Sequence, residues 1–168
     1  EAYRAEQTTI LEDARTKMAE LFEDEQQEIP VRAVTEEQVS EVESRLDEVT
    51  FEDYQAERDE YKAKLDTLCG FIKVREELDG KFEEGVLKSA TTAEEIEEMA
   101  QKLQDLQEGY RGVLQDRFEE MRAQYAKIGE LAAAVAGLFA DENMTEVRGD
   151  IVRENYNTVM EQYNVLPQ

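Results

Sequence analysis

The stretch Glu1-Ala2-Tyr3-Arg4 recurs as Glu108-Gly109-Tyr110-Arg111, and apolar residues around the two copies stay in the same register. At this offset Leu11 matches Phe118, Ala14 matches Met121 and Leu21 matches Ile128. After a small difference in loop length, Thr35-Glu36 matches Thr145-Glu146, Val42 matches Val152, Leu46 matches Tyr156 and Val49 matches Val159. Each module of a repeat protein buries the same apolar stripe while its surface residues drift. The pattern therefore predicts repeated helical modules, an architecture without specialised chemistry.

The amino-acid composition limits the classes of molecule that this protein is expected to bind. The chain has 168 residues, with 42 acidic and 19 basic side chains and a net charge of -23, and the acidic excess is greatest in residues 1–56. Such a charge opposes binding to nucleic acid and to anionic lipid surfaces. Two prolines and eight glycines leave little room for long loops. We expect a folded all-α protein that binds no nucleic acid and does not insert into a membrane.

The residue types needed for most catalysis are missing. There is no histidine, the commonest acid-base group and transition-metal ligand. The one cysteine, Cys69, lies in the apolar run Leu68–Ile72 and suits a buried position better than a reactive one. Asp141 begins a sequence like a calcium loop, but Glu146 stands at its sixth position, where glycine is required. We therefore expect no enzyme activity, cofactor, metal or small-molecule ligand, and a reducing, cytoplasmic location.

Apolar spacing and capping signals predict four helices. Two capping boxes, Thr35 with Gln38 and Thr92 with Glu95, mark helix starts, and Thr145 is interpreted as a third start. The apolar frame slips by one position near residues 50–54 and again near Gly109 and Gly112, where we expect a tolerated bend or a close helix contact. The expected helices cover residues 3–27, 35–84, 93–139 and 145–166.

Three segments resemble spectrin-type repeats, and among these the rod of α-actinin. They are Cys69–Leu78, similar to the middle of the family's first helix with Phe71 in the place of tryptophan; Thr92–Ile96, similar to the start of its second helix; and Val34–Gln38, similar to the start of its third. The chain departs from the family by lacking tryptophan, with Val42 and Val152 where a third-helix tryptophan is expected. The resemblance implies elongated antiparallel three-helix bundles.

The resemblance also implies a domain plan and a function. Residues 1–55 would form a partial repeat, with the second and third helices only, and residues 55–168 a complete repeat, joined by one continuous helix of about residues 35–84. The function implied is a rod, spacer and dimerisation segment of an α-actinin-like actin cross-linking protein of the cytoskeleton. Actin binding would belong to a flanking domain outside these 168 residues, and cytoskeletal scaffold proteins are further possible partners.

These expectations assign two sets of residues, one to a dimer interface and one to the core. A partial repeat without its first helix would leave part of residues 1–21 exposed, and such a patch favours an antiparallel homodimer in which the acidic N-terminal third faces the less acidic C-terminal third. The candidate dimer-interface residues are Tyr3, Ile10, Ala14, Met18 and Leu21. The expected core-packing residues are Cys69, Phe71, Ile72, Ile96, Leu103, Leu106, Tyr110, Phe118, Tyr125, Ile128, Val152 and Tyr156.

Two other functions remain open. An adaptor module that captures the amphipathic helix of a partner in a groove of the bundle is the main alternative. A crescent-shaped dimer that curves membranes ranks last, because such surfaces need basic clusters.

Overall fold

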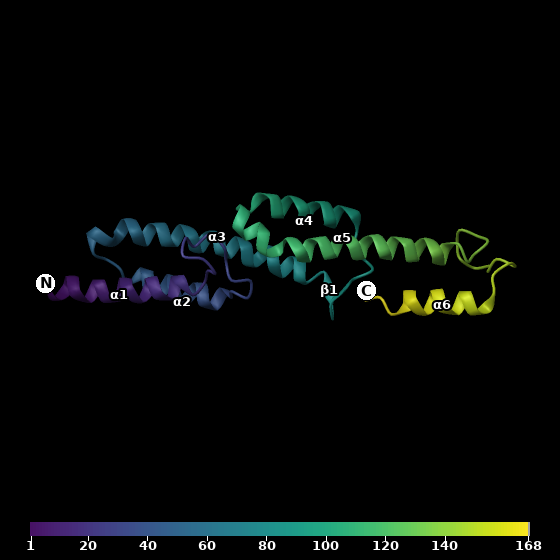
Figure 1. The fold of residues 1–168 in the computed structure, drawn as a ribbon, viewed down its shortest axis with the longest axis horizontal. Helices are drawn as coiled ribbons and strands as arrows, with labels where there is room; N and C mark the ends of the chain where they lie inside the picture. Colours follow the sequence, from purple (N-terminus) through teal and green to yellow (C-terminus); the bar gives the residue numbers. More distant parts are fainter. Residues whose placement is uncertain (168) are drawn as a thin grey trace. The chain divides into compact units, whose positions relative to one another are not determined.

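The computed structural model describes residues 1–167 and is built mostly of helices (Figure 1). The helices are α1 (Ala2–Ala19), α2 (Glu36–Asp47), α3 (Gln55–Asp79), α4 (Ala93–Asp105), α5 (Glu108–Ala136) and α6 (Arg153–Asn164), with a 3-10 turn η1 (Glu52–Tyr54) and a short antiparallel pair β1 (Phe82–Glu83) and β2 (Val86–Leu87). The expected all-α class is confirmed. The spectrin-like bundle itself stays a prediction.

The helix expected over residues 35–84 is wrong, because it is divided into α2 and α3. Between them the chain leaves helical geometry over residues 48–51. The Gln7 side chain, from α1, accepts hydrogen bonds from the backbone N–H groups of Thr50 (2.6 Å) and Phe51 (3.0 Å). In a continuous helix these two N–H groups would bond backbone carbonyls one turn earlier. Here they bond the Gln7 side chain instead, so this contact stabilises the break between α2 and α3. The frame slip near residues 50–54 marks this break.

The helix expected over residues 93–139 is also divided, into α4 and α5. The last turn of α4 tightens, with Leu106 N–H bonded to the Leu103 carbonyl at 3.2 Å, and α5 starts again with Arg111 N–H on the Gln107 carbonyl at 2.9 Å. Just inside α5, Tyr110 is 1% exposed and packs edge-on against the rings of Phe71 and Phe22. Burial of this ring fixes the direction of the new helix.

Both predicted capping boxes are confirmed, whereas the third helix start is wrong. Thr35 caps α2, with Gln38 returning the bond, and Thr92 and Glu95 make the same pair of bonds at α4. Thr145 lies in a loop, and Val152 is the residue before α6. The first helix likewise ends at Ala19 and not near Gln27.

The chain divides into two compact units. The first comprises Glu1–Glu77 with Gln101–Asp116, and the second comprises Leu78–Ala100 with the chain from Arg117 onward. The expected division into residues 1–55 and 55–168 stays a prediction. The core of the first unit includes Leu11, Met18, Leu46, Leu68, Phe71, Ile72 and Tyr110, and that of the second includes Leu78, Leu87, Met99, Phe118 and Met121.

Three helix hairpins follow one another along the chain. We name them the first hairpin (α1, loop 20–35, α2), the second hairpin (α3, loop 80–92, α4) and the third hairpin (α5, loop 137–152, α6). In each loop a phenylalanine pairs with a later residue: Phe22 with Pro30, Phe82 with Leu87, and Phe139 with Val147. The residue before the next helix, Thr35, Thr92 or Val152, always stands five positions after that partner.

The loops of the first and third hairpins are the same structure. Leu21 C=O accepts from Val31 N–H at 2.9 Å, and Leu138 C=O accepts from Arg148 N–H at 2.8 Å. Both loops also contain one residue with positive φ, Gln27 at 58° and Met144 at 54°. The equivalent residue in the third hairpin is therefore found by adding 117 to the number in the first hairpin.

This register corrects the one predicted from the sequence. The apolar matches place Leu21 with Ile128 and Val42 with Val152, whereas the structure makes Leu138 and Val159 the equivalent residues. The two errors are ten and seven residues, and a heptad stripe overlays itself at such shifts. The distinctive loop sequence Leu-Phe-x-Asp-Glu, at 21–25 and 138–142, carries the correct register.

Candidate interaction surfaces

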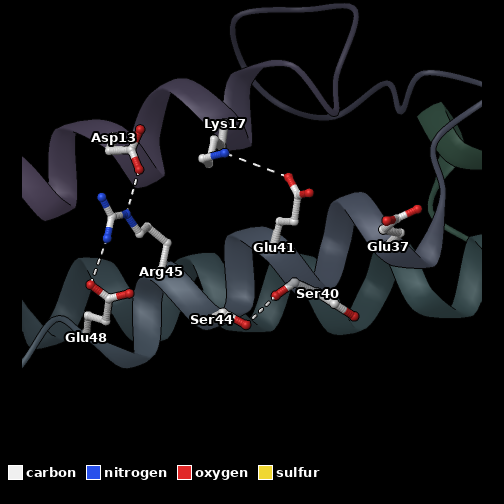
Figure 2. Close-up of a pocket in the computed structure, with 8 residues that line it drawn as sticks. All are labelled: Asp13, Lys17, Glu37, Ser40, Glu41, Ser44, Arg45 and Glu48. Carbon is white, nitrogen blue, oxygen red and sulfur yellow. Dashed lines mark hydrogen bonds and ion pairs between the residues drawn. The ribbon is translucent and has the colours of Figure 1, made fainter.

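A polar groove of about 660 Å³ runs between α1 and α2 (Figure 2). Arg45 Nε lies 2.6 Å from Asp13 of α1, and its Nη1 lies 2.7 Å from Glu48, the residue that follows α2. Lys17 and Glu41 are 3.7 Å apart. The hydrogen bond to Asp13 and the charge of Glu48 raise the pKa of Arg45. These ion pairs are exposed to water, which screens them, so each contributes little to stability. They favour the antiparallel alignment of α1 and α2.

The two serines that line this groove show no sign of activation. Ser44 Oγ donates to the Ser40 carbonyl, 2.8 Å away and one turn earlier in α2. A serine nucleophile requires a neighbouring general base, and histidine, the usual one, is absent from the chain. The remaining groove residue, Glu37, has a carboxylate exposed to water. The groove has the chemistry of a solvated polar surface.

Gln7 is a buried polar residue that joins α1 to the end of α2. Its side chain is 4% exposed, and besides accepting from Thr50 and Phe51 it donates through Nε2 to the Glu48 carbonyl at 3.1 Å. One amide thus pairs with three backbone groups at a helix end. Gln124, the equivalent residue of the third hairpin, instead bonds Leu87 N–H at 2.6 Å and the Gly85 carbonyl.

Arg75 of α3 is the buried cation of the first unit, 9% exposed. Its Nη1 donates to the carbonyls of Arg32 (2.6 Å) and Val34 (2.5 Å), in the loop of the first hairpin. Glu76 provides a carboxylate 3.7 Å away. Charged donors make strong hydrogen bonds in partly buried surroundings. Arg75 therefore holds the loop of the first hairpin in place immediately before the Thr35 cap.

A second contact joins α3 to α1. Arg15 and Glu57 form a two-point ion pair at 2.6 and 2.7 Å. The hydrogen bond from Arg15 lowers the pKa of Glu57, although partial burial opposes the shift. Further along α3, Lys62 pairs with Asp47 of α2. Helix α3 thus contacts both helices of the first hairpin.

The acidic loop residues Asp24 and Asp141 bind backbone groups. Asp141 Oδ1 accepts from Glu146 N–H at 2.7 Å and Thr145 N–H at 2.9 Å, and Asp24 Oδ1 accepts from Ile29 N–H at 2.7 Å and Glu28 N–H at 3.0 Å. The Thr145 hydroxyl and these N–H groups lower the pKa of Asp141. Across residues 1–167, no group of three or more acidic, cysteine or histidine side chains is arranged to hold a metal ion.

The candidate dimer-interface residues differ in exposure. Tyr3 is 50% exposed and Ile10 is half-buried, whereas Ala14, Met18 and Leu21 are at most 2% exposed within the chain itself. The expected exposure of the last three is wrong, because α3 packs on the first hairpin. No free hydrophobic patch of all five residues exists. Dimerisation stays a prediction.

The predicted core-packing residues fall into three groups. Those that are buried are Phe71, Ile72, Leu103, Tyr110 and Phe118, and those that are half-buried are Cys69, Ile96, Leu106, Tyr125, Ile128 and Tyr156. Val152 is 61% exposed, so its expected core position is wrong: it precedes α6 and is not within the helix. Burial and the neighbouring charge of Glu36 raise the pKa of the Cys69 thiol, which disfavours the reactive thiolate.

An apolar pocket of about 310 Å³ lies in the second unit. It is lined by Val86, Gln124, Lys127, Ile128, Leu131 and Leu166. The sequence predicts a core position for Ile128 and does not predict this pocket. The repeated loop sequence would have indicated it, since that register aligns Ile128 and Leu131 with the buried Leu11 and Ala14 of the first hairpin.

Comparison with known proteins gives no match. No protein-family model matches the chain, and neither the curated proteins nor the solved structures contain a significant relative. Within the described residues, no helix has the length and apolar character needed to cross a membrane.

Proposed function

We propose that this chain is a structural helical-repeat segment, a spacer and self-association element of the kind found in the rods of α-actinin-like cytoskeletal proteins. Its role would be to position neighbouring domains, including an actin-binding domain elsewhere in the same protein. The likeness to such rods rests on the segments Val34–Gln38, Cys69–Leu78 and Thr92–Ile96.

The observation that carries the structural role is the repetition of one hairpin design. A phenylalanine pairs across each loop, at Phe22, Phe82 and Phe139, and the next helix begins at a fixed distance from that pair. Tandem modules of this kind gain stability from contacts with their neighbours and serve widely as spacers and interaction surfaces. The two buried polar residues with special roles, Gln7 and Arg75, both bind backbone groups and so support a structural role as well.

The test of this proposal is the mass of the chain measured by sedimentation over a wide concentration range. We expect a species of twice 19.4 kDa at high concentration. Cross-linking with mass spectrometry then gives the orientation, and an antiparallel dimer predicts links between the acidic N-terminal residues and the third hairpin. A monomer at every concentration would contradict self-association.

An adaptor that binds a helix of a partner is the second candidate. It is favoured by the apolar pocket formed by Ile128, Leu131 and Leu166. Such a protein would remain monomeric and would gain a partner-dependent increase in stability.

A further inference from the structure

The turn between α2 and α3 reverses the chain without any residue that favours a tight turn. Helix α3 returns antiparallel to α2, since Lys62 pairs with Asp47 near the turn and Arg75 bonds the Val34 carbonyl at the far end. The turn, residues 48–54, contains no glycine, no proline and no residue with positive φ. The loops of the three hairpins, by contrast, each contain a residue with positive φ. The backbone preferences of the turn therefore do not require a reversal.

Most of this turn is already close to helical geometry. Glu48 has helical dihedral angles (φ -74°, ψ -14°), and the 3-10 turn η1 begins at Glu52. Phe51, between them, is extended, with ψ at 129°. If residues 49–51 took helical angles, α2, the turn and α3 would form one joined helix about 66 Å long, at about 1.5 Å per residue.

Contacts with α1 hold the turn in its bent form. Gln7 accepts hydrogen bonds from Thr50 N–H at 2.6 Å and Phe51 N–H at 3.0 Å, and the hydroxyls of Tyr3 and Thr50 are 2.6 Å apart. In the joined helix the two N–H groups would bond carbonyls in the last turn of α2 instead. The bent turn and the joined helix therefore satisfy the same backbone donors.

A joined helix in a single chain would uncover the side chains that α3 buries. Leu65, Leu68 and Phe71 are at most 3% exposed. A single chain therefore keeps the reversal, because opening would transfer these side chains to water. Two chains that open together avoid this cost, since each can place its α3 on the first hairpin of the other. Such domain swapping restores the same contacts between copies.

We propose that two copies of this chain associate by swapping α3, with residues 48–54 becoming helical and the chain from α3 onward packing on the first hairpin of the other copy. The inference rests on the self-association proposed above and gives it a contact surface. The contacts between copies are those that the single chain already makes, including Arg15 with Glu57 and Lys62 with Asp47. Because α3 is antiparallel to α2, the two joined helices run antiparallel, related by a twofold axis at the turn.

Cross-linking of a mixture of two isotopic forms tests the swap. Equal amounts of unlabelled chain and chain labelled with a heavy nitrogen isotope are unfolded together, refolded at high concentration and treated with a carbodiimide, which can join Lys62 to Asp47. Dimer and monomer are separated by size before digestion and mass spectrometry. In the dimer we expect about half of the Lys62–Asp47 links to join a labelled chain to an unlabelled one, the share that random pairing gives. In the monomer every such link should lie within one chain.

The outcomes separate this inference from the proposed function. A dimer whose Lys62–Asp47 links all lie within single chains would overturn the swap. Links between copies that join the N-terminal residues to the third hairpin would then show association through another surface, which leaves the proposed self-association intact. A chain that stays monomeric at every concentration would contradict both.

A pair of variants tests the turn itself. Gln7→Ala removes an amide that the bent turn uses and the joined helix does not, so we expect the dissociation constant of the dimer to fall by about tenfold or more. Adding Thr50→Pro gives the matched control: Thr50 is exposed, and the Gln7 side chain that pairs with its N–H is already removed. Proline is strongly unfavourable inside a helix, so the double variant should dimerise about tenfold more weakly than Gln7→Ala alone. Equal dissociation constants for these two variants would overturn the proposal.

Discussion

The buried side chains of Gln7 and Arg75 each bind a place where the backbone changes direction. Gln7 binds the end of α2, and Arg75 binds the loop before α2. An unpaired N–H or C=O group costs about 1–3 kcal/mol when it is buried, so these contacts stabilise bends that the backbone alone would not favour. The sequence does not reveal such residues, because a glutamine on α1 at this position has the same pattern as a solvated one.

Gln7→Ala tests this role. The substitution leaves the N–H groups of Thr50 and Phe51 and the Glu48 carbonyl without the side chain that pairs them, so we expect unfolding free energy to fall by about 2 kcal/mol. Chemical denaturation measures the change. Gln104→Ala, at an exposed position of α4, is the matched control and should change stability by less than about 0.5 kcal/mol. Equal effects of the two substitutions would show that the Gln7 side chain contributes no more to stability than an exposed residue of a helix.

Tyr110 predicts a sensitivity to alkaline pH. Burial, aided by the charge of Asp24, raises the pKa of Tyr110 from 10.0 to about 12. Above pH 10 the unfolded chain releases this proton before the folded chain does, so the stabilisation present below pH 10 is lost as pH rises toward 12. A difference of this size corresponds to about 3 kcal/mol.

Tyr110→Phe removes this titration while keeping the ring that packs on Phe71 and Phe22. We expect the variant to resemble the natural chain at pH 8 and to lose less stability between pH 10 and pH 12. Denaturant unfolding at a series of pH values measures how steeply the unfolding free energy of each protein falls with pH. An equal fall in both proteins would mean that the Tyr110 hydroxyl stays accessible to water.

At the scale of helices and loops, local signals predicted local structure well. The capping boxes at Thr35 and Thr92 are confirmed, because such a box is completed by residues three positions apart. The frame slips indicated where continuous helices are interrupted, but not that the backbone breaks there. The break after α2 depends on Gln7, more than 40 residues away in sequence, and no local pattern contains that contact.

Gly109 and Gly112 form a matched pair within α5. A Cβ at Gly109 would lie 2.3 Å from the Glu28 carbonyl oxygen, whereas a Cβ at Gly112 has open space. Gly109→Ala should therefore destabilise the chain by about 1–3 kcal/mol, since backbone must move to relieve the clash. Gly112→Ala should stabilise it by up to about 1 kcal/mol through helix propensity. Thermal unfolding of both variants is the measurement, and stabilisation by both would contradict the close approach.

At the scale of the whole chain, the repeat could be recognised in the sequence but its register could not. Apolar residues at heptad spacing match themselves at several shifts, so Val42 aligns equally well with Val152 and with Val159. The loops decide the register, because Asp24 and Asp141 make the same backbone hydrogen bonds. The pocket at Leu131 was missed for the same reason: only the correct register shows that its equivalent is buried.

Val42 and Val159 provide the sharpest comparison between the two ends of the chain, since they are the same residue at equivalent positions of α2 and α6. Val42 is 1% exposed, so Val42→Ala removes two buried methyl groups and should cost about 2 kcal/mol. Val159 is only half-buried, and Val159→Ala should cost less than about 1 kcal/mol.

Chemical denaturation measures both substitutions, and hydrogen exchange shows where each one acts. Because the third hairpin buries less apolar surface, its amides should exchange faster than those of α2 in the unmodified chain, as expected for the less stable part of a repeat. Equal costs of the two substitutions would mean that α6 is as well covered as α2. A larger cost for Val42, with faster exchange in α6, is the outcome that the difference in burial between α2 and α6 predicts.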